Sequence, residues 1–339
     1  MRLSALGDVC NTIPLIHAIQ RSQPDIKISW IIGKTEHALV SKLENVDFIT
    51  IDKTHLLSSK KTIRKWFKNH PADVLLLPQY ALRASLIAHS VKAPLIIGYD
   101  KQRSRDLQSL FINKRIEFTP HQHVVDAYLD FIKIICNYSD KPDFSIPAKT
   151  FGLSKAIEKI IPEDYLVFAP SASNSIRNWP AKSCAKVIRF ARQILGIKTV
   201  LVGAPNIEEI TLCQEIAKEA LVPIINLCGK THIPELVTLI NNATLVISPD
   251  SGPAHLANAT STPIIGLYAC SNPQRSGPYE QTYVINKYPE ACEKYLNKTA
   301  DEVPFGTRIH HKEAMELITV DEVNAMIVNV TGEGVTHND

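Results

Sequence analysis

Short apolar runs alternate with amphipathic stretches along the second half of the chain. Between the runs, apolar residues recur with a period near 3.6, as Val187, Ala191 and Ile194 do. Strands that are apolar on both faces and alternate with helices predict a parallel sheet covered on both sides, which is a doubly wound α/β domain. The expected strands are 165–170, 199–203, 224–228, 244–248 and 263–268.

The first half repeats this pattern less regularly. A polar stretch with Pro147 and Gly152 separates the two halves and predicts a linker, so we expect domains at 1–150 and 151–330. Doubly wound sheets bind ligands at the carboxyl ends of their strands, and two such domains facing each other predict one shared cleft. The expected elements of the first half are strands at 27–32, 48–51, 73–77 and 95–98 and a helix at 123–136.

The composition agrees with two domains. With 339 residues and 45% hydrophobic content, the chain can bury two ordinary cores. It contains no run of about 18 apolar residues and no leader of the secretory kind, so we expect a cytosolic protein. The seven cysteines are scattered and form no C-x-x-C pair, which argues against a disulfide framework and a zinc site.

The net charge of +3 is unevenly distributed. Residues 1–150 carry 21 Lys and Arg against 14 Asp and Glu, and this surplus favours an anionic partner, although an imbalance on solvated helices fits equally well. The segment "KKTIRKWFK" has five basic residues, with Ile63, Trp66 and Phe67 on one helical face. Such a helix could rest on an anionic membrane or could simply bury its apolar stripe.

The most informative turn follows the strand at 244–248 and reads "SPDSGPAHLANA". A helix is expected near Pro253, because proline is tolerated at the first helical position. The free amides and positive dipole end of that helix favour an anion such as phosphate. Ser251 and Gly252 would let a pyrophosphate approach the main chain, His255 could donate from the side, and Asp250 could order the turn or accept from sugar hydroxyls. A capped turn with a packed histidine is the alternative.

The amino terminus, "RLSALGDVCNTIP", offers a second turn of this kind. Gly7 permits a tight backbone, and Asp8 stands before a helix whose Val9, Ile13 and Ile16 share a face. Asp8 could cap this helix, or it could act as a general base in the cleft. The residues alone leave both interpretations open.

Further charged residues follow other expected strands. Arg177 in "SNSIRNWP" could reach a phosphate, and Glu208 and Glu209 could accept from a nucleoside or simply suit a helix's first turn. Arg103 and Arg105 in "DKQRSRD" could bind carboxylates in bidentate fashion. The chain lacks G-x-G-x-x-G after a strand, G-x-x-x-x-G-K-[ST] and a D-x-D pair, which weakens dinucleotide oxidoreductase, P-loop NTPase and metal-dependent transferase functions.

These motifs together resemble the ADP-heptose:lipopolysaccharide heptosyltransferases of glycosyltransferase family 9. "RLSALGD", "RNWP" and "SPDSGPAHLANA" match in order and spacing over nearly the whole chain, and "GYDKQRSRDLQSLFINKR" is most similar to heptosyltransferase I. The resemblance implies a GT-B fold with two Rossmann-like domains, the first binding the acceptor and the second the ADP-sugar. It implies an inverting transfer of heptose from ADP-heptose to Kdo-lipid A without metal, cofactor or nucleic acid, in the cytoplasm at the inner membrane.

The resemblance also assigns roles to individual residues. Asp8 would be the catalytic base, and Arg177 would bind the pyrophosphate. The sugar-nucleotide site would further comprise Glu208, Asp250, Ser251, Gly252 and His255, and the acceptor side Gln79, Arg83, Arg103 and Arg105.

One departure concerns the first strand. Family members usually have a hydrophobic strand before the first motif, whereas this chain begins at Met1. We therefore expect a truncated central strand with unpaired neighbours, and a natural start upstream. Transfer to a later core heptose, a non-catalytic sugar-nucleotide-binding protein and a Rossmann oxidoreductase remain as alternatives.

Overall fold

The computed structural model of the protein describes residues 1–280 and 282–333. It divides into two compact units, Met1–Ile146 and Pro147–Asp339, called here the first and second unit. Each unit is built on parallel strands with helices between them. No helix in the described ranges is both long and apolar enough to span a bilayer.

The second unit contains one six-stranded sheet in the order β11-β10-β9-β6-β7-β8, and every neighbouring pair is parallel. This confirms the parallel sheet and the five strands expected from the apolar runs, and it adds β11. All residues of β6, β9 and β10 are buried, which explains their continuous apolar sequences. The strands are β6 (Tyr165–Phe168), β7 (Lys198–Leu201), β8 (Ile225–Asn226), β9 (Leu245–Pro249), β10 (Ile264–Tyr268) and β11 (Val284–Asn286).

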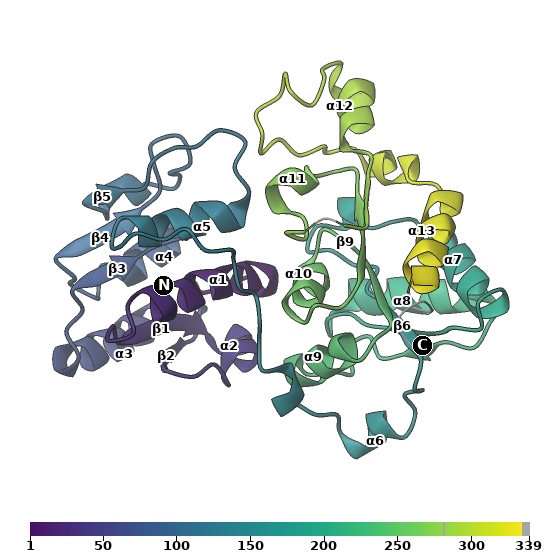
Figure 1. Ribbon diagram of the computed structural model, residues 1–339, viewed down its shortest axis with the longest axis horizontal. Coiled ribbons are helices and arrows are strands. Elements are labelled where there is room, and N and C mark those ends of the chain that lie inside the picture. The colour runs from purple at the N-terminus through teal and green to yellow at the C-terminus, as the bar shows by residue number, and fades with distance from the viewer. Residues whose placement is uncertain (281, 334–339) are drawn as a thin grey trace. The chain divides into compact units, whose positions relative to one another are not determined.

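Helices cover both faces of this sheet. Figure 1 shows α9 and α10 on one face and α7, α8 and α13 on the other. Val187 and Ala191 are buried as their spacing predicted, but Ile194 is 68% exposed because α7 ends at Gln193. The helices are α6 (Lys155–Glu158), α7 (Ala181–Gln193), α8 (Ile207–Ala220), α9 (Ile233–Asn241), α10 (Gly252–Ala259), α11 (Pro273–Ser276), α12 (Tyr288–Leu296) and α13 (Val320–Glu333).

The first unit carries two small parallel sheets, β1-β2 and β3-β4-β5. Four of these strands match the expected ones, and β5 was not predicted. The strands are β1 (Ile28–Gly33), β2 (Val46–Ile51), β3 (Val74–Leu76), β4 (Leu95–Gly98) and β5 (Lys114–Arg115). The helices are α1 (Leu6–Ser22), α2 (Lys34–Val40), α3 (Leu56–Asn69), α4 (Leu82–Ala88) and α5 (Val124–Lys133).

The first three residues join these two sheets. The N–H of Arg2 donates to the carbonyl of Ile31 over 3.2 Å, on the β1 side. The amino group of Met1 donates to the carbonyl of Leu76 over 2.6 Å, on the β3 side. No strand lies between the two sheets in the described residues, as the expected truncation predicts. The expectation that both neighbours are left wholly unpaired is wrong, because this short segment bonds to each of them.

Candidate functional site

The strand order of the second unit has a topological switch point between β6 and β9. The chain moves outward from β6 through β7 to β8, then returns to the other side of β6 as β9. Helices that follow the two central strands leave in opposite directions, and ligands of open α/β sheets bind in the crevice this creates. The segment after β6 carries Arg177, and the segment after β9 carries Asp250.

The structure brings Arg177 and Asp250 together in a buried ion pair. Nη1 of Arg177 donates to the Asp250 carboxylate over 2.7 Å and to its carbonyl over 2.8 Å, and Nη2 donates to Ser173 Oγ over 2.7 Å. Each of the paired side chains is only 9% exposed. The guanidinium is therefore held rigidly at the switch point, in the segment where the sequence predicted a phosphate-binding cation.

Two further residues of this network escaped the sequence analysis. Ser271 Oγ donates to the Asp250 carboxylate over 2.9 Å, so two donors fix that carboxylate. Burial and the nearby Asp250 charge raise the pKa of Tyr268, so its phenol is neutral. Both residues lie at the carboxyl end of β10, and the strand-end rule that singled out Asp250 would also have found them.

The turn after β9 has the predicted form. Ser251 is the N-cap of α10, yet its hydroxyl lies 2.7 Å from Ser248 Oγ and makes no capping bond to the helix. The Ser251 side chain therefore leaves the first amides of α10 to other acceptors, as an anion site requires. Gly252 opens the helix, and His255 lies in its first turn at 7% exposure. Binding of a sugar nucleotide here stays a prediction.

The neighbouring glutamates at the start of α8 differ in their contacts. Glu209 accepts from the backbone N–H of Ala204 and from Asn206 Nδ2, each over 2.8 Å, and thereby fixes the turn after β7. Glu208 is exposed, and its carboxylate contacts no donor in the described part of the chain. Glu208 is thus the acceptor available to a ligand, whereas Glu209 has a structural role.

In the first unit, Asp8 lies in the first turn of α1. The expected position just before the helix is wrong, because α1 begins at Leu6 and its N-cap is Ala5. Asp8 still supports the helix start from inside it, since its Oδ2 accepts from the Ala5 N–H over 3.1 Å, and it also forms an ion pair with Arg2. The Asp8 side chain remains 38% exposed, so a hydroxyl could still reach it. Capping and proton acceptance are therefore compatible, and the second role stays a prediction.

Arg2 is the residue of this site that the sequence analysis missed. It is 8% exposed, its Nη1 donates to the Pro78 carbonyl over 2.5 Å, and its guanidinium lies 5.7 Å from the centre of the Tyr128 ring. Burial raises the pKa of Tyr128, so that phenol is neutral and Asp8 is the anionic partner of Arg2. The signal was present, because Arg2 opens the motif that ends in Asp8.

The four predicted acceptor residues follow β3 and β4, which are hydrogen-bonded neighbours. Arg103 pairs with Asp100 and donates to Gln122 and to the Glu117 carbonyl, so it organises its own loop. Arg105 is exposed, and its side chain has no partner in the described ranges.

Gln79 and Arg83, which follow β3, also differ in their hydrogen bonds. Gln79 accepts the Leu3 N–H over 2.9 Å and so supports the segment that leads to Asp8. Arg83 is exposed and donates to the Lys53 carbonyl over 2.9 Å. Arg83 and Arg105 are thus the cations left accessible to a ligand.

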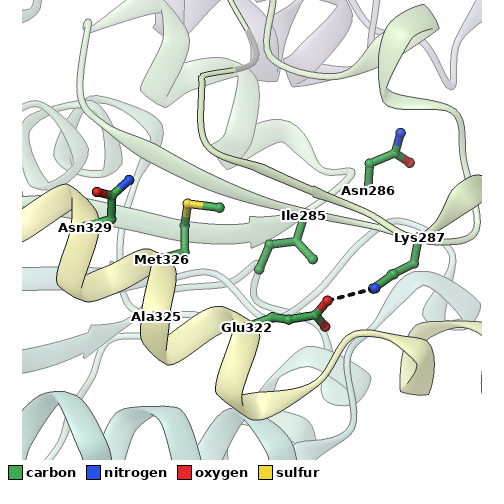
Figure 2. Close-up of a pocket in the computed structure, with 7 residues that line it drawn as sticks. All are labelled: Ile285, Asn286, Lys287, Glu322, Ala325, Met326 and Asn329. Carbon is green, nitrogen blue, oxygen red and sulfur yellow. Dashed lines mark ion pairs between the residues drawn. The ribbon is translucent and has the colours of Figure 1, made fainter.

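The second unit also has a pocket that lies away from Arg177 and Asp250. A pocket of about 460 Å³ lies between β11 and α13, and Figure 2 shows Lys287 and Glu322 at one end of it, 2.7 Å apart. Met326 and Ile285 supply apolar lining. The pocket borders the edge strand rather than the switch point, and its two charges neutralise each other, so we place the candidate site at the switch point.

Known proteins that are similar to this chain identify its family. The family model described as glycosyltransferase family 9 (heptosyltransferase) matches residues 61–304. The chain is 34% identical to the lipopolysaccharide core heptosyltransferase OpsX of Haemophilus influenzae, over 95% of this chain and 93% of that protein. It is 27% identical to lipopolysaccharide heptosyltransferase 3 of Escherichia coli, over 78% and 80%.

The fold is shared with a solved member of this group. The structure of the E. coli heptosyltransferase WaaC with ADP superposes with a TM-score of 0.71 at 20% identity, and covers 97% of this chain and 100% of that one. The expected GT-B fold is thereby confirmed. The family model and the similarity to OpsX confirm the transferase class. This chain belongs to glycosyltransferase family 9, the heptosyltransferases.

Proposed function

We propose that the protein transfers heptose from ADP-heptose to the Kdo residue of Kdo-lipid A, with inversion and without a metal ion, in the cytoplasm. The observation that carries this proposal is the buried Arg177–Asp250 pair beside the uncapped start of α10, in a chain that belongs to this family. A cation and free amides at two neighbouring strand ends suit a diphosphate leaving group.

Each residue has a defined task in the proposed reaction. An acceptor hydroxyl gives its proton to Asp8 while its oxygen forms a bond to the anomeric carbon of heptose. The bond from that carbon to the β-phosphate oxygen breaks, and ADP leaves. Arg177, the α10 amides and His255 stabilise the charge that grows on the diphosphate, so this chain's own groups do the work that a metal ion does elsewhere.

Support for the donor and the acceptor differs in kind. WaaC was solved with ADP and shares the fold, which supports an adenine nucleotide as the donor's leaving group. OpsX is named as a core heptosyltransferase and is similar over nearly the whole chain, which supports an acceptor in the lipopolysaccharide core. Similarity to heptosyltransferase 3 keeps transfer to a later core heptose as a second candidate.

The test offers the purified chain ADP-heptose with either Kdo-lipid A or a core acceptor that already carries one heptose. We expect the mass of one heptose to be added to Kdo-lipid A only. Turnover on the heptosylated acceptor alone would establish the second candidate. Binding of ADP without turnover on either acceptor would indicate a non-catalytic binding protein. A strain that lacks the protein should make a lipooligosaccharide that ends at Kdo, as read by mass spectrometry.

A further inference from the structure

Helix α3 of the first unit carries an uncompensated cationic stripe. Its sequence, LLSSKKTIRKWFKN, contains five Lys and Arg residues and no acid. Four of these cations are exposed and recur at helical spacing, so they share one side of the helix. None of them pairs with an acid in the described part of the chain. The four are Lys61, Arg64, Lys65 and Lys68.

An exposed leucine completes this stripe. Leu57 is 83% exposed and precedes Lys61 by one helical turn, on the same side. The opposite side is buried, since Ile63 is 0% exposed and Trp66 and Phe67 pack against the core of the first unit. The two aromatic side chains therefore pack in that core, and Leu57 is the apolar side chain that the stripe exposes to solvent.

We infer that the α3 stripe, Leu57 with Lys61, Arg64, Lys65 and Lys68, docks the protein on an anionic lipid surface. Acidic lipid headgroups attract each such cation with a strength that corresponds to about a fivefold gain in binding. A leucine among the cations can enter the boundary between headgroups and acyl chains, which a polyanion such as nucleic acid does not offer. The combination therefore fits a bilayer better than it fits a nucleic acid.

The attachment of α3 supports a docking role. Ser59 Oγ donates to the Asp52 carbonyl over 2.7 Å, and Asp52 accepts from Thr54, so the start of the helix is tied to the end of β2. Arg83 donates to the Lys53 carbonyl in the same segment. The stripe thus begins next to the strand ends that carry the exposed Arg83, where a lipid-linked acceptor sugar would arrive.

The experiment measures cosedimentation of the full chain with vesicles, in the absence of donor and acceptor. We expect binding to vesicles of phosphatidylglycerol and phosphatidylcholine, weakening with salt, and none to phosphatidylcholine alone. Replacing the four cations by glutamine should lower partitioning at least about 100-fold. Leu57→Ser should lower it about tenfold, with little change in its salt dependence.

A matched control removes the same charge elsewhere. Four exposed lysines of the second unit are changed to glutamine, and this variant should bind vesicles as the unchanged protein does. They are Lys155, Lys159, Lys182 and Lys186. All variants should keep their melting temperature and ADP affinity.

Three results would overturn the inference: no binding of the unchanged protein to acidic vesicles, equal binding to neutral ones, or equal losses in the α3 variant and the control. Because no sugar is present, these results are independent of the transferase assay. The inference can fail while the proposed function holds, and the reverse is also true.

Discussion

The two units place charge at their strand ends in different ways. In the second unit, Arg177 and Asp250 are each 9% exposed in their side chains and hold each other in place. In the first unit, Asp8 is 38% exposed, and Arg83 and Arg105 lie at the surface. A buried pair is costly to desolvate but preorganised, which suits one small charged leaving group. Exposed groups suit a large acceptor that stays partly in solvent.

Changing Asp8 should produce the largest effect and should separate the tasks of the two units. Asp8→Asn removes the proton acceptor, so we expect turnover to fall about 10³-fold. The proposed diphosphate contacts lie in the second unit and are untouched, so ADP affinity measured by calorimetry should not change. Loss of ADP affinity in this variant, or full activity, would remove Asp8 from the catalytic role.

The ion pair with Arg2 calls for a stability control on the same variant. Asp8→Asn also leaves the buried Arg2 without its anion, so the melting temperature should fall by a few degrees. Asp8→Glu retains the negative charge that pairs with Arg2 but shifts the carboxylate from the position that it has in Asp8. A variant that melts like the unchanged protein and still lacks turnover would place the defect in the chemistry alone.

Changing Arg177 should give the opposite pattern. Arg177→Ala removes the proposed charge-assisted donor to the diphosphate and leaves Asp250 buried without its cation, so ADP should bind about 10- to 100-fold more weakly. Arg177→Lys should recover part of this loss. Arg192→Ala serves as a control, because that residue donates to the Gly196 carbonyl at the far end of α7. Unchanged ADP affinity in Arg177→Ala would contradict the assignment.

The same contrast explains what the sequence could predict. The turn from Asp250 to His255 is local, since strand, turn residues and helix start are adjacent in the chain, and the structure has that turn. Ser271 and Arg2 stand in or beside segments that the sequence marked, but their bonds to Asp250 and Pro78 join segments that are distant in the chain, and no local pattern reports which partner each one takes. Ile194 fitted the helical period but is exposed, because periodicity does not reveal where a helix ends.

Adjacent glutamates in α8 provide a finer test within the second unit. Glu208→Ala should weaken nucleotide binding about fivefold and leave stability unchanged, because the carboxylate is exposed and unpaired in the described chain. Glu209→Ala should lower the free energy of unfolding by about 1 kcal/mol through loss of the bonds to Ala204 and Asn206. Calorimetry and urea denaturation of both variants distinguish ligand contact from turn support. The reverse pattern would exchange their roles.

The smallest effect should come from the surface pair of Lys287 and Glu322, which contrasts with the buried pair in the same unit. Partial burial raises the pKa of Glu322, but hydrogen bonds from Lys287 and Thr319 outweigh it and bring the pKa below its ordinary value of 4.5. The pair therefore stabilises the fold above that pH, and the contribution is lost as pH falls through the folded-state pKa.

Glu322→Gln should cost about 0.5 kcal/mol at neutral pH, since the carboxylate is 37% exposed and solvent screens the pair. At a pH well below the folded-state pKa of Glu322, the difference from the unchanged protein should vanish because both side chains are then neutral. Glu290→Gln is the control, because Glu290 lies 3.5 Å from Lys287 and is 50% exposed, so its effect should be smaller still. Urea denaturation at neutral pH and at the lower pH gives the free energy of unfolding of each variant relative to the unchanged protein. If Glu322→Gln lowered it equally at both pH values, the Glu322 charge would not stabilise the fold.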